Sequence, residues 1–207
     1  EKTKPEDLYH NIPEYIELEE KFGIRSTFFF RTFYENGDVL DYEDDIKQLH
    51  ESNWEIGLHT DPTSVDNLEK IQKEKEKLES ITGKQIIGNR VHYLNYNSGL
   101  LEKLEKLGFS YDSSLRHSKD RIDENEMGYS RINGIIEFPV TLMDAYLFTY
   151  MKIQEDKIIS EFQKTLELGR NLSENNVISV IWHDNVLKMK GGRMYKQILD
   201  FLTSQDD

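Results

Sequence analysis

Three of the six histidines in this sequence follow short apolar runs of the kind that form buried strands. His59 directly follows the run 54–58, His183 follows 177–182, and His92 comes shortly after a third run. An imidazole can bind a divalent metal ion, or act as an acid or base near neutral pH. The types and places of these residues therefore predict metal or acid-base chemistry.

Carboxylates occupy comparable places along the chain. Asp112 follows 109–111, the run 135–140 leads to Asp144, and Asp184 comes directly after His183. In parallel α/β folds the carboxyl ends of the strands converge, so polar residues placed there are expected to meet. Imidazoles with nearby carboxylates suit Zn²⁺ or a similar divalent ion. The sequence has no HExxH or comparable contiguous metal motif, so this interpretation depends on placement.

The hydrophobic pattern predicts the strands and helices that would position these residues. Short apolar runs alternate with helical patterns, which is typical of an α/β fold with a parallel sheet. The clearest helix is expected at 64–82, where apolar residues form one stripe and Gly83 ends it. Right-handed crossovers would wind about six βα units into a barrel or a doubly wound sheet. Further helices are expected at 13–22, 42–53, 100–107, 158–166 and 194–202, strands at 26–30, 54–58, from 86 onward, 109–111, 135–140 and 177–182, and an irregular loop at 117–134.

Composition restricts the class of protein. The 207 residues are enough for one core, and we expect a single domain over 1–207. A net charge of −13 argues against nucleic acid and against an anionic membrane as partners. The absence of cysteine excludes disulfides, thiolate metal sites and cysteine nucleophiles. The sequence shows no signal-like segment and no apolar run near the roughly 18 residues of a membrane span, so we expect a cytoplasmic protein.

Several segments resemble one known family. The segment 55–60, which contains His59, is similar to the second motif of the polysaccharide deacetylase (NodB-homology) family. Residues 90–93 resemble its Arg-x-Pro-Tyr motif, with His92 in place of proline. The segment 180–184 resembles the last motif, a hydrophobic strand that ends in the catalytic histidine. Residues 108–114 resemble the strand of the fourth motif, and 23–29 resemble the family's second strand. The motifs occur in the family's order.

The resemblance implies a fold and a mechanism. The fold is a deformed (β/α) barrel with mostly parallel strands, and the cofactor is one divalent metal, Zn²⁺ first, with Co²⁺ or another ion as alternatives. The metal would polarise an acetamide carbonyl and lower the pKa of its bound water. A carboxylate would take the proton of that water, and protonated His183 would give one to the leaving amine. Arg90 fits the residue that orients the carboxylate. Asp112 fits the residue that holds or tunes His183, with Asp184 as a rival.

Residues near these motifs, most of them aromatic, are expected either to contact the substrate or to pack in the core. We expect Tyr93, Trp182 and Asp184 to contact the substrate. Trp182 precedes His183 in one strand, so its ring is also expected to point the opposite way and to pack against a helix. The aromatic residues after Ala145 are expected in the core or at its rim rather than as a sugar platform: Tyr146, Phe148 and Tyr150.

Two departures from the family pattern concern the metal ligands. The family's first motif, a strand that ends in two aspartates, is expected upstream of Glu1, since Glu6-Asp7 follows no strand-like run. The family's His-x-x-x-His pair is incomplete, because Thr63 stands four residues after His59. We hypothesise that His92 replaces the missing ligand, since it enters the site with the third motif.

Three functions agree with these observations. The first is a metal-dependent hydrolase that removes N-acetyl groups from a sugar or polysaccharide. The second is a catalytically degenerate relative that binds carbohydrate or serves assembly on the same barrel. The third is a hydrolase of other specificity, such as a deaminating or amidase-like enzyme on a small molecule. The oligomeric state is left open.

Overall fold

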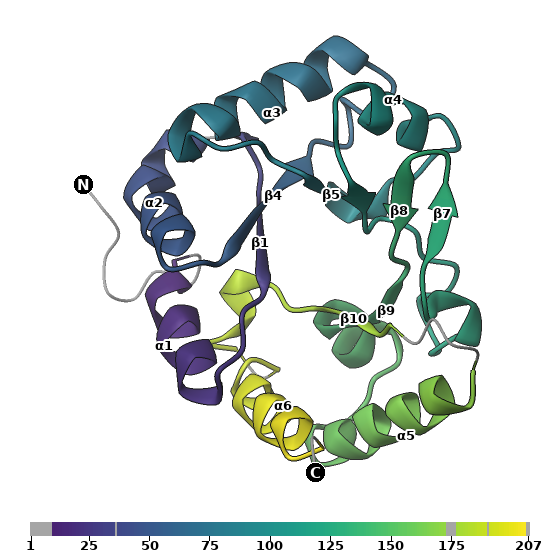
Figure 1. Ribbon diagram of the computed structural model, residues 1–207. Helices are drawn as coiled ribbons and strands as arrows, with labels where there is room; N and C mark the ends of the chain where they lie inside the picture. The colour runs from purple at the N-terminus through teal and green to yellow at the C-terminus, as the bar shows by residue number, and fades with distance from the viewer. Residues whose placement is uncertain (1–9, 36, 173–176, 190, 206–207) are drawn as a thin grey trace. The chain divides into compact units, whose positions relative to one another are not determined.

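The computed structural model describes residues 10–35, 37–172, 177–189 and 191–205 (Figure 1). The chain forms two compact units. Unit 1 comprises Glu1–Ile24, Arg116–Gly128 and Val140–Asp207, and unit 2 comprises Arg25–Leu115 and Tyr129–Pro139. Glu6-Asp7, which we predicted not to be the family's first motif, lies outside the described residues.

Unit 2 contains a six-stranded sheet in the order β1-β4-β5-β6-β8-β7. All neighbours pair in parallel except β7 and β8, which are antiparallel. A separate hairpin of β2 and β3 follows β1. The strands are β1 Thr27–Phe30, β2 Phe33–Tyr34, β3 Gly37–Asp38, β4 Glu55–Thr60, β5 Gly88–Val91, β6 Tyr111–Asp112, β7 Ser130–Ile132 and β8 Ile135–Glu137.

Helices cover this sheet. In Figure 1, α2 (Glu43–Glu51) and α3 (Leu68–Thr82) lie beside each other along β4. The side chain of Asn67 caps the start of α3, and Gly83 ends that helix in a left-handed conformation. The helix α4 (Leu100–Lys106) contacts β8. Short 3-10 turns occur at η1 Val39–Tyr42 and η2 His92–Leu94.

Unit 1 has its own parallel pair of strands, β9 (Val140–Met143) and β10 (Ser179–Ile181). Helix α1 (Ile12–Phe22), with proline in its first turn, contacts α6 (Arg193–Thr203), which also contacts α5 (Ile158–Asn171). Side chains of β9, α5, α6 and the short helix at 146–150 form a core cluster of Leu142, Leu147, Ile158, Phe162, Met194 and Ile198. Short turns lie at η3 Glu124–Glu126, the π-helix η4 Tyr146–Tyr150, η5 Glu155–Lys157 and η6 Asp184–Val186.

The predicted α/β class with mostly parallel strands is confirmed. The predicted strand 135–140 is wrong in one respect, because it divides into β8 and β9 on either side of Phe138-Pro139, and proline cannot donate to a sheet. The predicted loop 117–134 contains η3 and β7. Among the described residues, no helix combines the length and apolar character needed to cross a membrane. The single domain over 1–207 stays a prediction.

Candidate functional site

His59 lies at the carboxyl end of β4, opposite Arg90 in the register with β5. Its ring Nδ1 is 2.9 Å from the main-chain oxygen of Arg90. A carbonyl oxygen only accepts, so Nδ1 must carry the proton and donate it. In the neutral ring the other nitrogen, Nε2, then keeps its lone pair, which is the form that binds a metal ion.

The ring of His92 lies next to that of His59, with centroids 5.1 Å apart and planes 73° apart. His92 begins the short turn η2 directly after β5. The structure thus brings together the two predicted metal ligands within unit 2. Thr63, which stands at the family's usual second position, is exposed and donates its hydroxyl hydrogen to Asp61.

Imidazole nitrogen is one of the usual ligands of zinc. Within the described part of the chain, however, no group of three or more histidine, aspartate or glutamate residues is arranged to hold a metal ion. The residues present therefore match a divalent ion in donor type, but those described do not by themselves form a metal site.

Tyr93 follows His92 in an unusual conformation. Its φ is 61° and that of Leu94 is 53°, both in the left-handed region that non-glycine residues seldom adopt. The Tyr93 ring stacks on His92 with centroids 3.9 Å apart, and the residue is 79% exposed. An exposed aromatic ring is therefore held beside the imidazole pair at a backbone cost of about 1–2 kcal/mol per residue.

Arg90 clamps a neighbouring loop. Its Nε donates to the carbonyl oxygen of Ser113 at 3.0 Å, and its Nη2 donates to the Ser113 hydroxyl at 2.8 Å. The guanidinium lies over the ring of Phe29. Burial lowers the pKa of Arg90 to about 10. The predicted role of Arg90 in orienting a carboxylate base stays a prediction.

His183 finds its carboxylate partner in Asp144. Its Nδ1 lies 2.6 Å from Asp144 Oδ1, and its main-chain N–H donates to Asp144 Oδ2 at 2.7 Å. The main-chain N–H of Ala145 also donates to Oδ1. Asp144 is 1% exposed, whereas the side chain of His183 is 44% exposed. The pair is therefore a buried carboxylate that holds an accessible imidazole.

The expectation that Asp112 or Asp184 holds His183 is corrected by this geometry. Ile181 of β10 pairs with Met143 of β9, so the residues that follow these two strands meet. The sequence predicted Asp144 as a carboxylate at the end of a strand. Its partner, His183, could be identified only from the pairing of β9 with β10.

Asp112 and Asp184 occupy other places. Asp112 is fully buried in unit 2, where it accepts hydrogen bonds from Asn89 and Ser114. Asp184 accepts the main-chain N–H of Asn11 in unit 1, and burial raises its pKa to about 6. The Tyr15 hydroxyl donates to the carbonyl of His183. Sequence reasoning gave no role at the site to Asn11, the residue before α1, or to Tyr15 of α1, because their positions carried no catalytic signal.

Trp182 packs inside unit 1. Its ring stacks on Tyr195 of α6, with centroids 5.7 Å apart, and meets the edge of Phe148. Trp182 thus faces a helix, as its place in the strand predicted. Its predicted contact with a substrate is untested.

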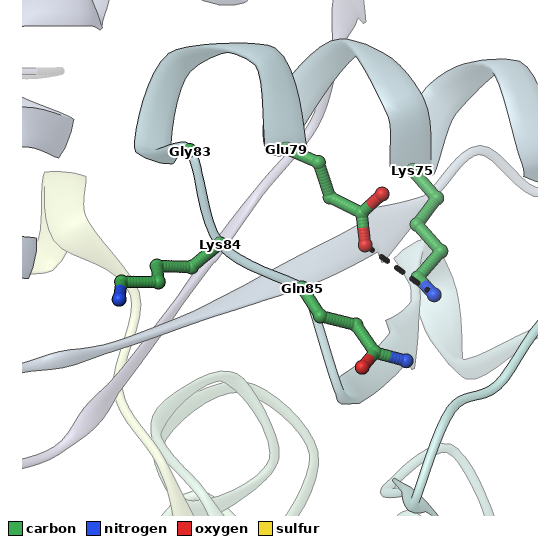
Figure 2. Close-up of a pocket in the computed structure, with 5 residues that line it drawn as sticks. All are labelled: Lys75, Glu79, Gly83, Lys84 and Gln85. Atoms are coloured by element: carbon green, nitrogen blue, oxygen red, sulfur yellow. Dashed lines mark ion pairs between the residues drawn. The ribbon is translucent and has the colours of Figure 1, made fainter.

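A shallow surface cavity of roughly 470 Å³ lies elsewhere in unit 2, lined by Lys75, Glu79, Gly83, Lys84 and Gln85 (Figure 2). It lies where α3 ends and the chain leads toward the amino end of β5. Lys75 pairs with Glu79 and donates to the carbonyl of Leu107. Ligands of parallel α/β folds bind at the opposite, carboxyl ends of the strands, so we assign no substrate to this cavity.

The parallel sheets, with polar residues beyond the ends of their strands, define a protein of the α/β class. The family profile described as polysaccharide deacetylase matches residues 6–111, more than half of the chain. The chain belongs to the polysaccharide deacetylase family.

Solved structures share this fold. A Mycobacterium smegmatis protein assigned as a polysaccharide deacetylase aligns with a TM-score of 0.72 at 17% identity, covering 95% of this chain and 72% of that one. Puue allantoinase aligns with a TM-score of 0.71 at 15% identity, covering 95% and 67%. A CE4 family pseudoenzyme from Bacillus anthracis aligns with a TM-score of 0.60 at 12% identity, covering 94% and 56%.

At these identities the likeness establishes the fold alone. The similar structures include proteins described as deacetylases, as an allantoinase and as a pseudoenzyme, so the fold does not select among the three functions. No curated protein matches the chain.

Proposed function

We propose that this chain is a metal-dependent carbohydrate deacetylase, which hydrolyses the amide bond of N-acetyl groups on a sugar or polysaccharide. The observation that carries the proposal is the His59–His92 pair, in which the Arg90 carbonyl leaves His59 Nε2 with a lone pair. In that tautomer Nε2 can bind a metal ion while Nδ1 is held by the main chain, an arrangement common among metal-binding histidines.

His59 and His92 are the proposed ligands. The metal, Zn²⁺ or a similar divalent ion, supplies Lewis acidity toward the amide carbonyl and a lowered pKa for bound water. Further ligands are needed to complete its coordination. Arg90 contributes by holding His59 through its carbonyl and by fixing the adjacent loop at Ser113.

His183 is the proposed general acid. When water adds to the amide carbon and the C–N bond breaks, the leaving nitrogen needs a proton to depart as an amine. The carboxylate of Asp144 at Nδ1 favours the protonated imidazole and leaves Nε2 as the group that can donate. The products are acetate and the free amine.

Among the predicted substrate contacts, Tyr93 has the exposure that the role requires. Its outer face is suited to stacking on the apolar face of a sugar ring. Trp182 and Asp184 are engaged within unit 1, and we propose for them the support of the His183 segment in addition to any substrate contact. A cytoplasmic location stays a prediction.

The first experiment is calorimetry of the whole chain with Zn²⁺ and with Co²⁺. We expect one ion per chain in the wild type, and loss of that binding in His59→Ala and in His92→Ala. The control is His117→Ala, which removes an exposed imidazole of unit 1. Unchanged affinity in His59→Ala or His92→Ala would reject that residue as a ligand.

An assay for amine release from N-acetylated sugars then separates the functions. Metal-dependent release supports the deacetylase. Metal binding without release, on sugars and on small amides alike, favours the degenerate relative that binds carbohydrate. Turnover of a small cyclic amide or ureide alone would favour the third function, for which the allantoinase-like fold is the relevant observation.

A further inference from the structure

Two carboxyl groups meet in the interior of unit 2. Asp112 of β6 and Glu137 of β8 are directly paired in the parallel register, so their side chains project on the same face of the sheet. Both residues are completely buried. Their carboxyl groups interact with each other.

This contact requires a proton. Asp112 Oδ1 accepts from Asn89 at 2.6 Å and from the Ser114 hydroxyl at 2.9 Å, while Glu137 Oε1 accepts main-chain N–H groups of Ser114 and Leu115. The remaining oxygens, Asp112 Oδ2 and Glu137 Oε2, are buried and have no hydrogen-bond partner within the described ranges. Two ionised oxygens repel, so one carboxyl group of the pair must be protonated. Burial and the neighbouring Asp112 raise the pKa of Glu137 to about 9.

The pair is linked to the strand that carries the imidazole site. Ser114 Oγ accepts the main-chain N–H of Val91 at 2.8 Å and passes its own hydrogen to Asp112. The side chain of Asn89 joins Asp112 to the same strand, β5. Both sides of Arg90 are thereby anchored, and it is the Arg90 carbonyl that sets the tautomer of His59. His92 follows Val91 directly.

We propose that Asp112 and Glu137, sharing one proton, are positioning residues that act through Ser114 and Asn89 on the His59–His92 pair. The inference rests on the proposed function for the meaning of that pair, but the orientation of His59 can be measured without any metal. Partners that orient a ligand histidine commonly change metal affinity 10- to 100-fold when removed.

The test compares three variants of the whole chain. Ser114→Ala removes the hydroxyl that joins Val91 to Asp112. Glu137→Gln keeps an oxygen for Ser114 and Leu115 and replaces the shared proton with a permanent amide N–H donor to Asp112. The matched control is Ser118→Ala, which removes a buried serine hydroxyl of unit 1 that is bonded to Asp120.

Two readouts are needed. The first is the tautomer of His59 in the metal-free protein, from ¹⁵N NMR of the ring nitrogens. The second is the affinity for Co²⁺ alone and the visible spectrum of the Co²⁺ protein. In Ser114→Ala we expect a mixture of His59 tautomers and Co²⁺ affinity about 10- to 100-fold weaker. In Glu137→Gln and Ser118→Ala we expect the wild-type tautomer, spectrum and affinity.

The outcomes separate this inference from the proposed function. If the wild type binds no Co²⁺, the proposed function fails, while the His59 tautomer in Ser114→Ala still decides whether the acid pair positions the ring. A wild-type tautomer and affinity in Ser114→Ala would overturn the inference. So would a loss in Glu137→Gln as large as in Ser114→Ala, because the shared proton would then not be replaceable by an amide. Should Ser114→Ala fail to fold, Ser114→Cys keeps the volume with a weak donor and carries the same expectation.

Discussion

At the scale of single residues, the His183–Asp144 pair is the most specific arrangement in unit 1. Both oxygens of Asp144 accept hydrogen bonds, from the His183 ring, from its main-chain N–H and from Ala145. An amide offers one acceptor oxygen only, so Asp144→Asn must place its NH₂ group against a donor. We expect amine release to fall about 10²- to 10⁴-fold, because the His183 ring loses the carboxylate that orients it.

This prediction is checked by steady-state kinetics of amine release. Asp156→Asn is the control, since it removes an exposed carboxylate of unit 1 that pairs with Lys157. Activity within twofold of the wild type in Asp144→Asn would show that His183 is not the acid of the reaction.

Glu137 makes a pH-dependent contribution to stability. Its pKa is raised from 4.5 to about 9 in the folded chain, so the folded state binds more protons than the unfolded state within that window. The contribution of Glu137 is complete below pH 4.5 and is lost as pH rises toward 9, by at most about 1.4 kcal/mol per pH unit. Urea unfolding from pH 5 to 9 should therefore show a steeper decline for wild type than for Glu137→Gln. Parallel curves for the two proteins would contradict the shared proton.

At the scale of elements, two glycines make room for the aromatic layer of unit 2. A Cβ at Gly57 of β4 would lie 2.5 Å from the ring of Phe29, and one at Gly88 of β5 would lie 2.3 Å from the ring of Tyr111. These two rings meet edge to face, and that of Phe29 supports the Arg90 guanidinium. Glycine at positions 57 and 88 therefore leaves the space that the rings of Phe29 and Tyr111 occupy near the imidazole site.

Gly88→Ala is expected to destabilise the chain by about 1–3 kcal/mol, because the ring of Tyr111 must move within a packed layer. Gly99→Ala is the matched control, since its Cβ would meet only the end of the Lys103 side chain at 3.2 Å and an oxygen of Asn97 at 3.6 Å. Denaturant midpoints measure both changes. An equal effect of the two substitutions would show that the aromatic layer yields without cost.

Elements with a strong periodic pattern could be predicted, and those set by tertiary contacts could not. The stripe of α3 and its stop at Gly83 appear directly in the sequence. By contrast, β7 consists of exposed residues with no apolar alternation and forms because β8 lies beside it. The π-helix that follows Asp144 likewise has no local signal.

The same division applies to the candidate site. His59, His92 and His183 were visible because each follows a run of apolar residues. Asp144 and Glu137 received no role, because a partner across a sheet depends on strand order and register. Arg90 was recognised from a motif, but its structural contribution through a main-chain carbonyl cannot be read from a side-chain pattern.

At the scale of the whole molecule, the path of the chain couples the two units. The chain passes between them at Ile24–Arg25, Leu115–Arg116, Gly128–Tyr129 and Pro139–Val140. Within unit 1, Asn11 bonds to Asp184, 173 residues away. The segments of unit 1 can therefore pack together only if the segments of unit 2 between them form closed loops. If unit 2 were unfolded, closing these loops would cost conformational entropy.

We therefore expect one cooperative unfolding transition, as the predicted single domain requires. At about 0.7 kcal/mol per residue near 60 °C, the 207 residues should give a calorimetric enthalpy of about 145 kcal/mol. Differential scanning calorimetry should yield a van't Hoff enthalpy equal to this value if the units unfold together. A van't Hoff enthalpy near half the calorimetric one, or two resolved peaks, would mean that the units unfold separately. In that case a destabilising change confined to unit 2, such as Gly88→Ala, should move only one of the peaks, whereas a coupled chain shifts its single transition as a whole.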